Sequence, residues 1–221
     1  MAPYQKRVDA SLEALAKFTG AESPQDLFSI ELSMLLDEMK EDYETWDKNT
    51  PERFIFDLLV RRSTTAVVDY WETILMIIAA NVEKGKDYEL RMDMLSLVEH
   101  FLTQKDLHST VVFYSEIILK MILIPTIVWQ VGKPIVRIRK AAVVCLIRLV
   151  EEKLIEPEKV HESFRPMLNN MKGCLDEDYA NDLRFAAVVA LRHIIDMIGP
   201  LMEEEDHREL YTELIKRLDD A

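Results

Sequence analysis

Cysteine, glycine and proline are scarce in this chain of 221 residues, which holds 2, 5 and 8 of them. The two cysteines, Cys145 and Cys174, are too few for a disulfide framework and are typical of a reducing compartment. The few glycines and prolines exclude the turn-rich chemistry of a β-sandwich or barrel. The scarcity therefore favours a helical protein, and we expect a cytoplasmic location.

Positive charge and long apolar runs are also lacking. The chain has 27 Lys and Arg against 40 Asp and Glu, a net charge of −13 with His neutral. This balance excludes a general binder of the nucleic-acid backbone, which needs a basic footprint. The longest apolar run, 121–132, contains Pro125 and is shorter than the ~20 residues of a membrane helix. We expect no nucleic acid, membrane or small-molecule substrate as a partner.

Helical periodicity is abundant, since 49% of the residues are hydrophobic and their spacing follows the helical repeat. Val143, Leu146, Ile147 and Val150, for example, fall at i, i+3, i+4 and i+7. No sustained alternation with period two indicates a strand. The sequence predicts an all-α protein with about ten helices, at 4–18, 24–45, 51–62, 64–84, 87–103, 107–131, 134–153, 157–175, 179–198 and 203–219.

An internal repeat accompanies the helices. The segments 138–146 and 183–191 are identical at six of nine positions and lie 45 residues apart. A proline and a glycine seven residues apart precede each copy, and a weaker third copy begins at Leu90. Two helices per unit at this period are typical of HEAT and armadillo repeats. We therefore expect residues 1–221 to form one α-solenoid segment of HEAT/armadillo-type helical pairs, clearest at about 107–153 and 157–198.

The chain ends after a helix, 210–220, that resembles the first half of a further repeat. A solenoid normally closes with a polar capping repeat. We therefore expect this sequence to be a fragment of a longer array.

Arginines and lysines of the repeats fall into two predicted groups. Arg91, Arg139 and Arg184 occupy the repeat position at which an arginine commonly pairs with turn acids of a neighbouring unit, so we predict a structural role. The segment 133–153 carries a local excess of positive charge, and it provides the candidate partner-binding residues Lys133, Arg137, Lys140 and Arg148. Such a strip steers an acidic partner, although a simply solvated helix face gives the same pattern.

Signals for chemistry are weak by comparison. The sequence contains no nucleophile elbow, dinucleotide fingerprint, P-loop or H-E-x-x-H motif. Glu203 and His207 are spaced for one metal, but a solvated surface pair is the commoner meaning of this spacing. Cys145 is expected in the core, and Cys174 has only Lys172 as a nearby base. Trp129 could belong to the docking strip or to the core, and the core is the usual place of a tryptophan in a stacked helix. We predict a non-enzymatic protein with no metal or cofactor.

One stretch, Ile124–Pro125, Trp129, Gly132–Lys133, Ile138–Arg139, Ala141–Val143 and Cys145–Leu146, resembles the C-terminal HEAT array of the dynein axonemal assembly factor 5 family. The resemblance extends over about residues 50–221 and is weak before them, and residues 176–198 keep the repeat register with few family residues. It implies a cytoplasmic scaffold that preassembles dynein arms before their transport into cilia. Implied partners are dynein intermediate or heavy chains, other assembly factors and chaperones.

Other functions remain open at this point. An acidic solenoid also suits the cradling of basic peptides, as in nuclear transport receptors. A tubulin-binding array is disfavoured because tubulin's surface is acidic, like this chain. A metal-dependent HEAT hydroxylase needs several His–Glu dipeptides, and the sequence has only His161–Glu162.

Overall fold

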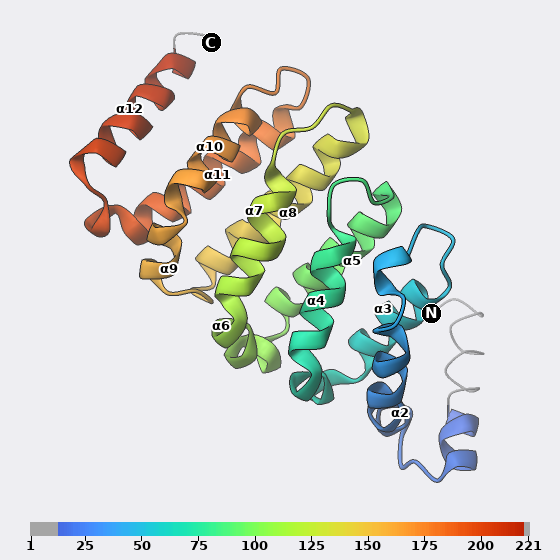
Figure 1. Cartoon of the computed structure of the whole chain (residues 1–221). Helices are drawn as coiled ribbons and strands as arrows, with labels where there is room; N and C mark the ends of the chain where they lie inside the picture. Colours follow the sequence, from blue (N-terminus) through green and yellow to red (C-terminus); the bar gives the residue numbers. More distant parts are fainter. Residues whose placement is uncertain (1–12, 219–221) are drawn as a thin grey trace. The chain divides into compact units, whose positions relative to one another are not determined.

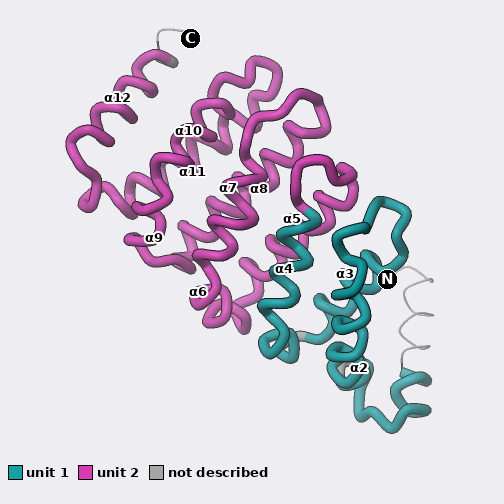
Figure 2. Tube along the Cα trace, in the orientation of Figure 1, with its two compact units in different colours: residues 1–81 teal, residues 82–221 magenta. Residues whose placement is uncertain are grey.

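The computed structural model describes residues 13–218, which form helices and no strand (Figure 1). This confirms the prediction of an all-α protein. Residues 13–19 are helical, and the rest of the helix predicted at 4–18 lies outside the described residues. The chain divides into two compact units, residues 1–81 and 82–221 (Figure 2). The single solenoid over 1–221 stays a prediction.

Unit 1 is built around α2 (Pro24–Met39), α3 (Glu52–Arg62) and α4 (Trp71–Asn81), with short 3₁₀ turns at Tyr43–Thr45 and Thr64–Tyr70. Ser23 caps α2, since its hydroxyl accepts from the Asp26 amide at 3.2 Å and Pro24 fits the first helical turn. The core of the unit includes Leu32, Phe56 and Trp71. The helices predicted at 24–45 and 64–84 are therefore each shorter than expected and joined to a 3₁₀ turn.

Unit 2 arranges its helices in two layers. In one layer α8 (Lys133–Glu151) packs between α5 (Tyr88–Thr103) and α11 (Asn181–Ile198). In the other, α10 (Phe164–Leu175) packs against α7 (Ile124–Ile127) and α12 (Glu204–Leu218). The remaining elements are the 3₁₀ turn Lys105–Leu107, α6 (His108–Ile117), the π-helix η4 (Ile118–Leu123), α9 (Pro157–Glu162) and the 3₁₀ turn Gly199–Leu201.

The two layers touch through α7 with α8 and α10 with α11, so each contact joins one helix of a pair to the other (Figure 1). Between the layers lies a core of fully buried aliphatic and aromatic side chains. They include Leu90, Phe101, Ile122, Ile138, Leu146, Met171, Leu183 and Ile194. The burial of these large apolar side chains between the two helical layers stabilises unit 2.

Prolines interrupt the first helix of both clear repeats. Pro125 has no amide to donate to the carbonyl of Met121, and the chain before it adopts the π-helix η4. Pro166 likewise cannot donate to Glu162, at which α9 ends. The single helix predicted at 157–175 is therefore two helices, α9 and α10.

By length and composition alone, one helical stretch among the described residues, Lys105–Ile127, is apolar enough to cross a membrane. The sequence estimate of a twelve-residue run missed it because that estimate stopped at Lys120. Ile118, Leu119 and Ile122 of this stretch are fully buried in unit 2. A buried core helix has the same length and apolar composition. Packing in the core of unit 2 therefore accounts for the apolar residues of this stretch.

Candidate functional site

Arg139 anchors the amino-terminal part of α8 from inside the fold. Its side chain is fully buried, and Nε donates to the carbonyl of Ile127, the last residue of α7, at 3.1 Å. Nη1 lies 2.8 Å from Oε2 of Glu177 in the turn after α10, and Nη2 lies 3.2 Å from Sγ of Cys174. One guanidinium thus joins α7, α8 and the following helical pair.

Arg91 repeats part of this arrangement in α5. It is also fully buried, and its Nε donates to the carbonyl of Val82 at 2.9 Å, while burial lowers its pKa. The two arginines therefore each satisfy a carbonyl at or just past the end of the preceding helix, where backbone acceptors lack partners. The repeat position noticed in the sequence corresponds to this shared hydrogen bond.

Arg184, the third arginine of the repeat position, is exposed. No helix in the described part of the chain covers the face of α11 on which Phe185 and Val188 are also exposed. Arg139 by contrast is covered by the turn between α10 and α11. Within residues 13–218 no turn acid pairs with Arg184, so its expected structural role stays a prediction.

The four candidate partner-binding residues lie on α8 in two different situations. Lys140 forms an ion pair with Asp182 of α11 at 2.6 Å, and Arg148 forms one with Glu99 of α5 at 3.3 Å. Both pairs are at least two-fifths exposed on the basic side, so solvent screens them and each adds little to stability. The Asp182 carboxyl has its pKa lowered by the hydrogen bond from Lys140.

Lys133 and Arg137 are exposed, and within residues 13–218 neither has an ion-pair partner. Arg137 and Lys140 line a hollow of about 400 Å³ between α5 and α8, whose floor includes Leu95 and Cys145. The predicted strip is therefore divided: its carboxyl-terminal half is tied to neighbouring helices, and its amino-terminal half faces solvent.

Aromatic side chains accompany the exposed half. Trp129 is 57% exposed and Val131 is more exposed still, which corrects the expectation that Trp129 is a core residue. Its Cβ lies beside Gly173 of α10, so the loop before α8 is braced against the next pair. We call Trp129, Val131, Lys133 and Arg137 the basic edge. Sequence periodicity misplaced Trp129 because it extended the preceding helix to 131, whereas α7 ends at Ile127.

Helix electrostatics oppose the charge of the basic edge. Lys133 is the first residue of α8, the first turn contains no acid, and the cap is Gly132 with φ of 128°. A cation at the positive end of a helix dipole costs about 0.3–1 kcal/mol. Lys133 therefore does not serve the stability of α8.

Neither cysteine has the environment of a nucleophile. Burial raises the pKa of Cys145 to about 12, and its thiol donates to the carbonyl of Leu95 at 3.7 Å. Burial also raises the pKa of Cys174, although Arg139 acts in the opposite direction. Sequence reasoning missed Arg139 as a basic neighbour of Cys174 because 35 residues separate them.

The described residues contain no cluster of three His, Cys, Asp or Glu side chains that could hold a metal ion. In the one pair that the spacing singled out, Nδ1 of His207 contacts the backbone carbonyl of Glu203 at 3.1 Å. The contact of this pair is thus between a ring nitrogen and the backbone.

Comparison with known proteins identifies one kind of relative. Dynein axonemal assembly factor 5 from Homo sapiens is 25% identical over 219 residues, and that from Mus musculus is 23% identical over 221. The Xenopus laevis protein of the same name is 21% identical over 224 residues. The alignments cover 97–98% of this chain and 26% of each relative. No protein-family model and no solved structure matches the chain.

These likenesses are distant but consistent, since all three are to proteins named dynein axonemal assembly factor 5 and each covers nearly the whole chain. The resemblance seen in the residues around Trp129 is thereby confirmed. It also extends further than the sequence suggested, because the alignments reach almost the whole chain rather than residues 50–221. The chain spans about a quarter of the length of these relatives.

Proposed function

We propose that this chain is a non-enzymatic scaffold segment that takes part in the cytoplasmic preassembly of axonemal dynein arms. The observation that carries the proposal is the similarity of nearly the entire chain to proteins named dynein axonemal assembly factor 5. The name of those relatives supports a role in dynein assembly rather than a catalytic one. Because the chain spans only a quarter of them, the role concerns this segment and its surfaces.

The packing of unit 2 supports a scaffold built from HEAT-type pairs. Its two layers, the repeated arginine bond of Arg91 and Arg139, and the 45-residue spacing are what stacked helical pairs produce. Stacked pairs expose long side surfaces, and these hold proteins rather than small substrates. Dynein intermediate or heavy chains, other assembly factors and chaperones are the partners that we propose for them.

The basic edge is the part of this surface that we propose for an acidic partner. Among the described residues 13–218 its two cations have no carboxylate partner, and Trp129 supplies the aromatic side chain that is enriched at protein interfaces. In a chain of net charge −13, an exposed local cationic site is selective for an acidic segment. Lys140 and Arg148 contribute to the field but are already paired.

The experiment that tests the proposal is affinity purification of the chain from ciliating cells, followed by mass spectrometry. Recovery of dynein chains or chaperones is expected with the unmodified chain, and a clear loss is expected with the double variant Lys133→Glu/Arg137→Glu. The double variant Lys17→Glu/Lys105→Glu is the matched control, because it makes the same charge change at two other exposed lysines. Recovery of nuclear import cargo in place of dynein proteins would contradict the proposal.

A further inference from the structure

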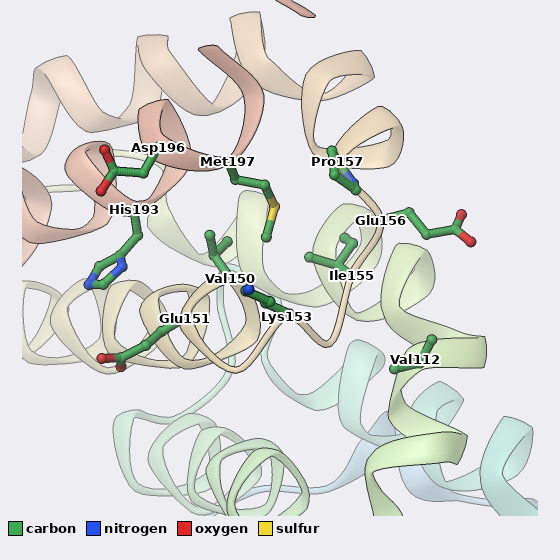
Figure 3. A pocket seen from close by; sticks show the side chains of 10 residues that line it. All are labelled: Val112, Val150, Glu151, Lys153, Ile155, Glu156, Pro157, His193, Asp196 and Met197. Carbon is green, nitrogen blue, oxygen red and sulfur yellow. The ribbon is translucent and has the colours of Figure 1, made fainter. Parts of the chain in front are cut away.

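A second hollow, of about 570 Å³, lies at the other end of α8 (Figure 3). Its walls come from α6, from the end of α8 with the loop that follows, and from the last turn of α11. The apolar part is formed by Val112, Val150, Ile155, Pro157 and Met197. Figure 3 shows the side chains of Val150, Ile155 and Met197 turned toward the interior of the hollow.

Charged side chains surround this apolar interior. Three carboxylates, those of Glu151, Glu156 and Asp196, line the hollow beside one lysine, Lys153. In Figure 3 the carboxylates point away from the apolar centre toward its rim. All three residues are exposed, and the contacts that Glu156 and Asp196 make with basic residues of their own helices are long, 3.4 and 3.8 Å.

One rim carboxylate, that of Glu151, lies where the dipole of α8 disfavours negative charge. Glu151 is the last residue of α8 and Glu152 is its C-cap, where a negative charge meets the negative end of the helix dipole. Helix stability therefore gives no reason for the carboxylate of Glu151, whereas Glu156 is the N-cap of α9, where a negative charge is favoured. An external cation would satisfy Glu151.

We propose that this hollow is a docking site for a linear basic peptide that inserts one aliphatic side chain between flanking lysines or arginines. The apolar walls match the aliphatic anchor, and the three carboxylates match the flanking cations. A volume of about 570 Å³ is in the range of sites that bind small ligands and is large enough for one side chain with adjoining backbone.

The site is independent of the proposed role of the basic edge. It lies at the opposite end of α8, and its residues come from α6, the end of α8 with the loop that follows, the start of α9, and α11, rather than from the loop before α8. Charge of the opposite sign at the two ends selects ligands of opposite sign. The binding of a basic peptide to the hollow can therefore be tested in the absence of any dynein protein.

A binding measurement with the 221-residue chain tests the site. The probe is a fluorescent heptapeptide with a central leucine and three alternating lysines and arginines on each side. We expect saturable binding, and about tenfold weaker binding when the leucine is replaced by serine, because an apolar anchor is lost. An acidic heptapeptide with the same central leucine is expected to bind more weakly than the basic one.

Variants of the chain locate the binding. Met197→Ser is expected to weaken it about tenfold, and Val112→Ser, on the exposed wall, gives a second reading if the first variant disturbs folding. Glu151→Lys is expected to weaken binding about threefold. Asp178→Lys, the same charge change on an exposed residue in the turn after α10, is expected to leave it unchanged.

Three results would overturn the proposal. The first is no binding of the basic leucine peptide, and the second is tighter binding of the acidic one. The third is an equal effect of Glu151→Lys and Asp178→Lys, which indicates attraction to the whole acidic chain and not to the hollow.

Discussion

The two ends of α8 differ in sign and in shape. The amino-terminal end carries exposed cations, with the exposed Trp129 on the loop before it, whereas the carboxyl-terminal end borders an apolar hollow with a carboxylate rim. Yet the ends share one property, because each carries charge that its helix dipole disfavours. A charge that costs helix stability at both ends is better explained by what the surfaces bind than by how the helix folds.

The largest expected effect concerns the buried support of the amino-terminal end. Arg139→Met removes the partner of the Ile127 carbonyl and leaves Glu177 largely buried without its cation. We expect a loss of about 3 kcal/mol in the free energy of unfolding, measured by urea denaturation followed by circular dichroism. Arg184→Met, at the exposed equivalent position, is expected to change it by less than about 0.5 kcal/mol. If Arg139→Met and Arg184→Met lowered the free energy of unfolding by similar amounts, burial of Arg139 would not explain its contribution to stability.

The next effect separates binding from stability at the basic edge. Lys133→Glu replaces a disfavoured cation with a favoured anion at the first turn of α8, so we expect stability to rise by about 0.3–1 kcal/mol. The same variant should weaken capture of an acidic partner, and more strongly at low salt than at high salt, since exposed charges are screened. Thermal unfolding and a salt series of binding measure the two quantities. If Lys133→Glu lowered both the stability of the chain and its capture of an acidic partner, Lys133 would have a structural role.

Between the two ends, Cys145 makes stability depend on alkaline pH. The unfolded thiol ionises near pH 9, whereas the buried one has its pKa raised to about 12. Above pH 9 the unfolded state therefore holds fewer protons than the folded state, and stability falls as pH rises. We expect this group to cost about 1 kcal/mol between pH 8 and pH 10. The difference in that pH slope between the unmodified chain and Cys145→Ala isolates the contribution.

The smallest effect concerns the turn that closes the carboxyl-terminal end. Lys153 has φ of 54° and follows the C-cap of α8, where its amide donates to Val150 and that of Leu154 donates to Leu149. Glycine is preferred at such a left-handed position, so Lys153→Gly is expected to stabilise the chain by about 0.5 kcal/mol. It also removes the one lysine from the rim of the hollow and should tighten basic-peptide binding about twofold. Destabilisation would show that the lysine side chain supports the turn.

Sequence reasoning predicted what depends on local pattern. Periodicity gave the all-α class and most helix positions, and the repeated arginine led to the buried bonds of Arg91 and Arg139. It failed where the answer depended on which helix lies alongside. Trp129 looked like a core residue until α7 ended at Ile127, and the partners of Lys140 and Arg148 are 42 and 49 residues away. No pattern in the sequence indicated the hollow at Met197, because its lining comes from four helices, α6, α8, α9 and α11.

The ion pairs between helical pairs in unit 2 have a direction. In six of those formed by its described residues the base comes first in the sequence and the acid follows 37–42 residues later: Lys120–Glu162, Arg139–Glu177, Lys140–Asp182, Arg165–Glu205, Arg165–Asp206 and Lys172–Glu209. Only Arg148–Glu99 runs the other way in this set. Each helical pair thus contributes bases to the ion pairs with the following helical pair and acids to those with the preceding one. The stack of helical pairs therefore has a direction along the sequence. Pairs of this kind can be added or duplicated in one orientation only, and a reversed pair would set like charges against each other.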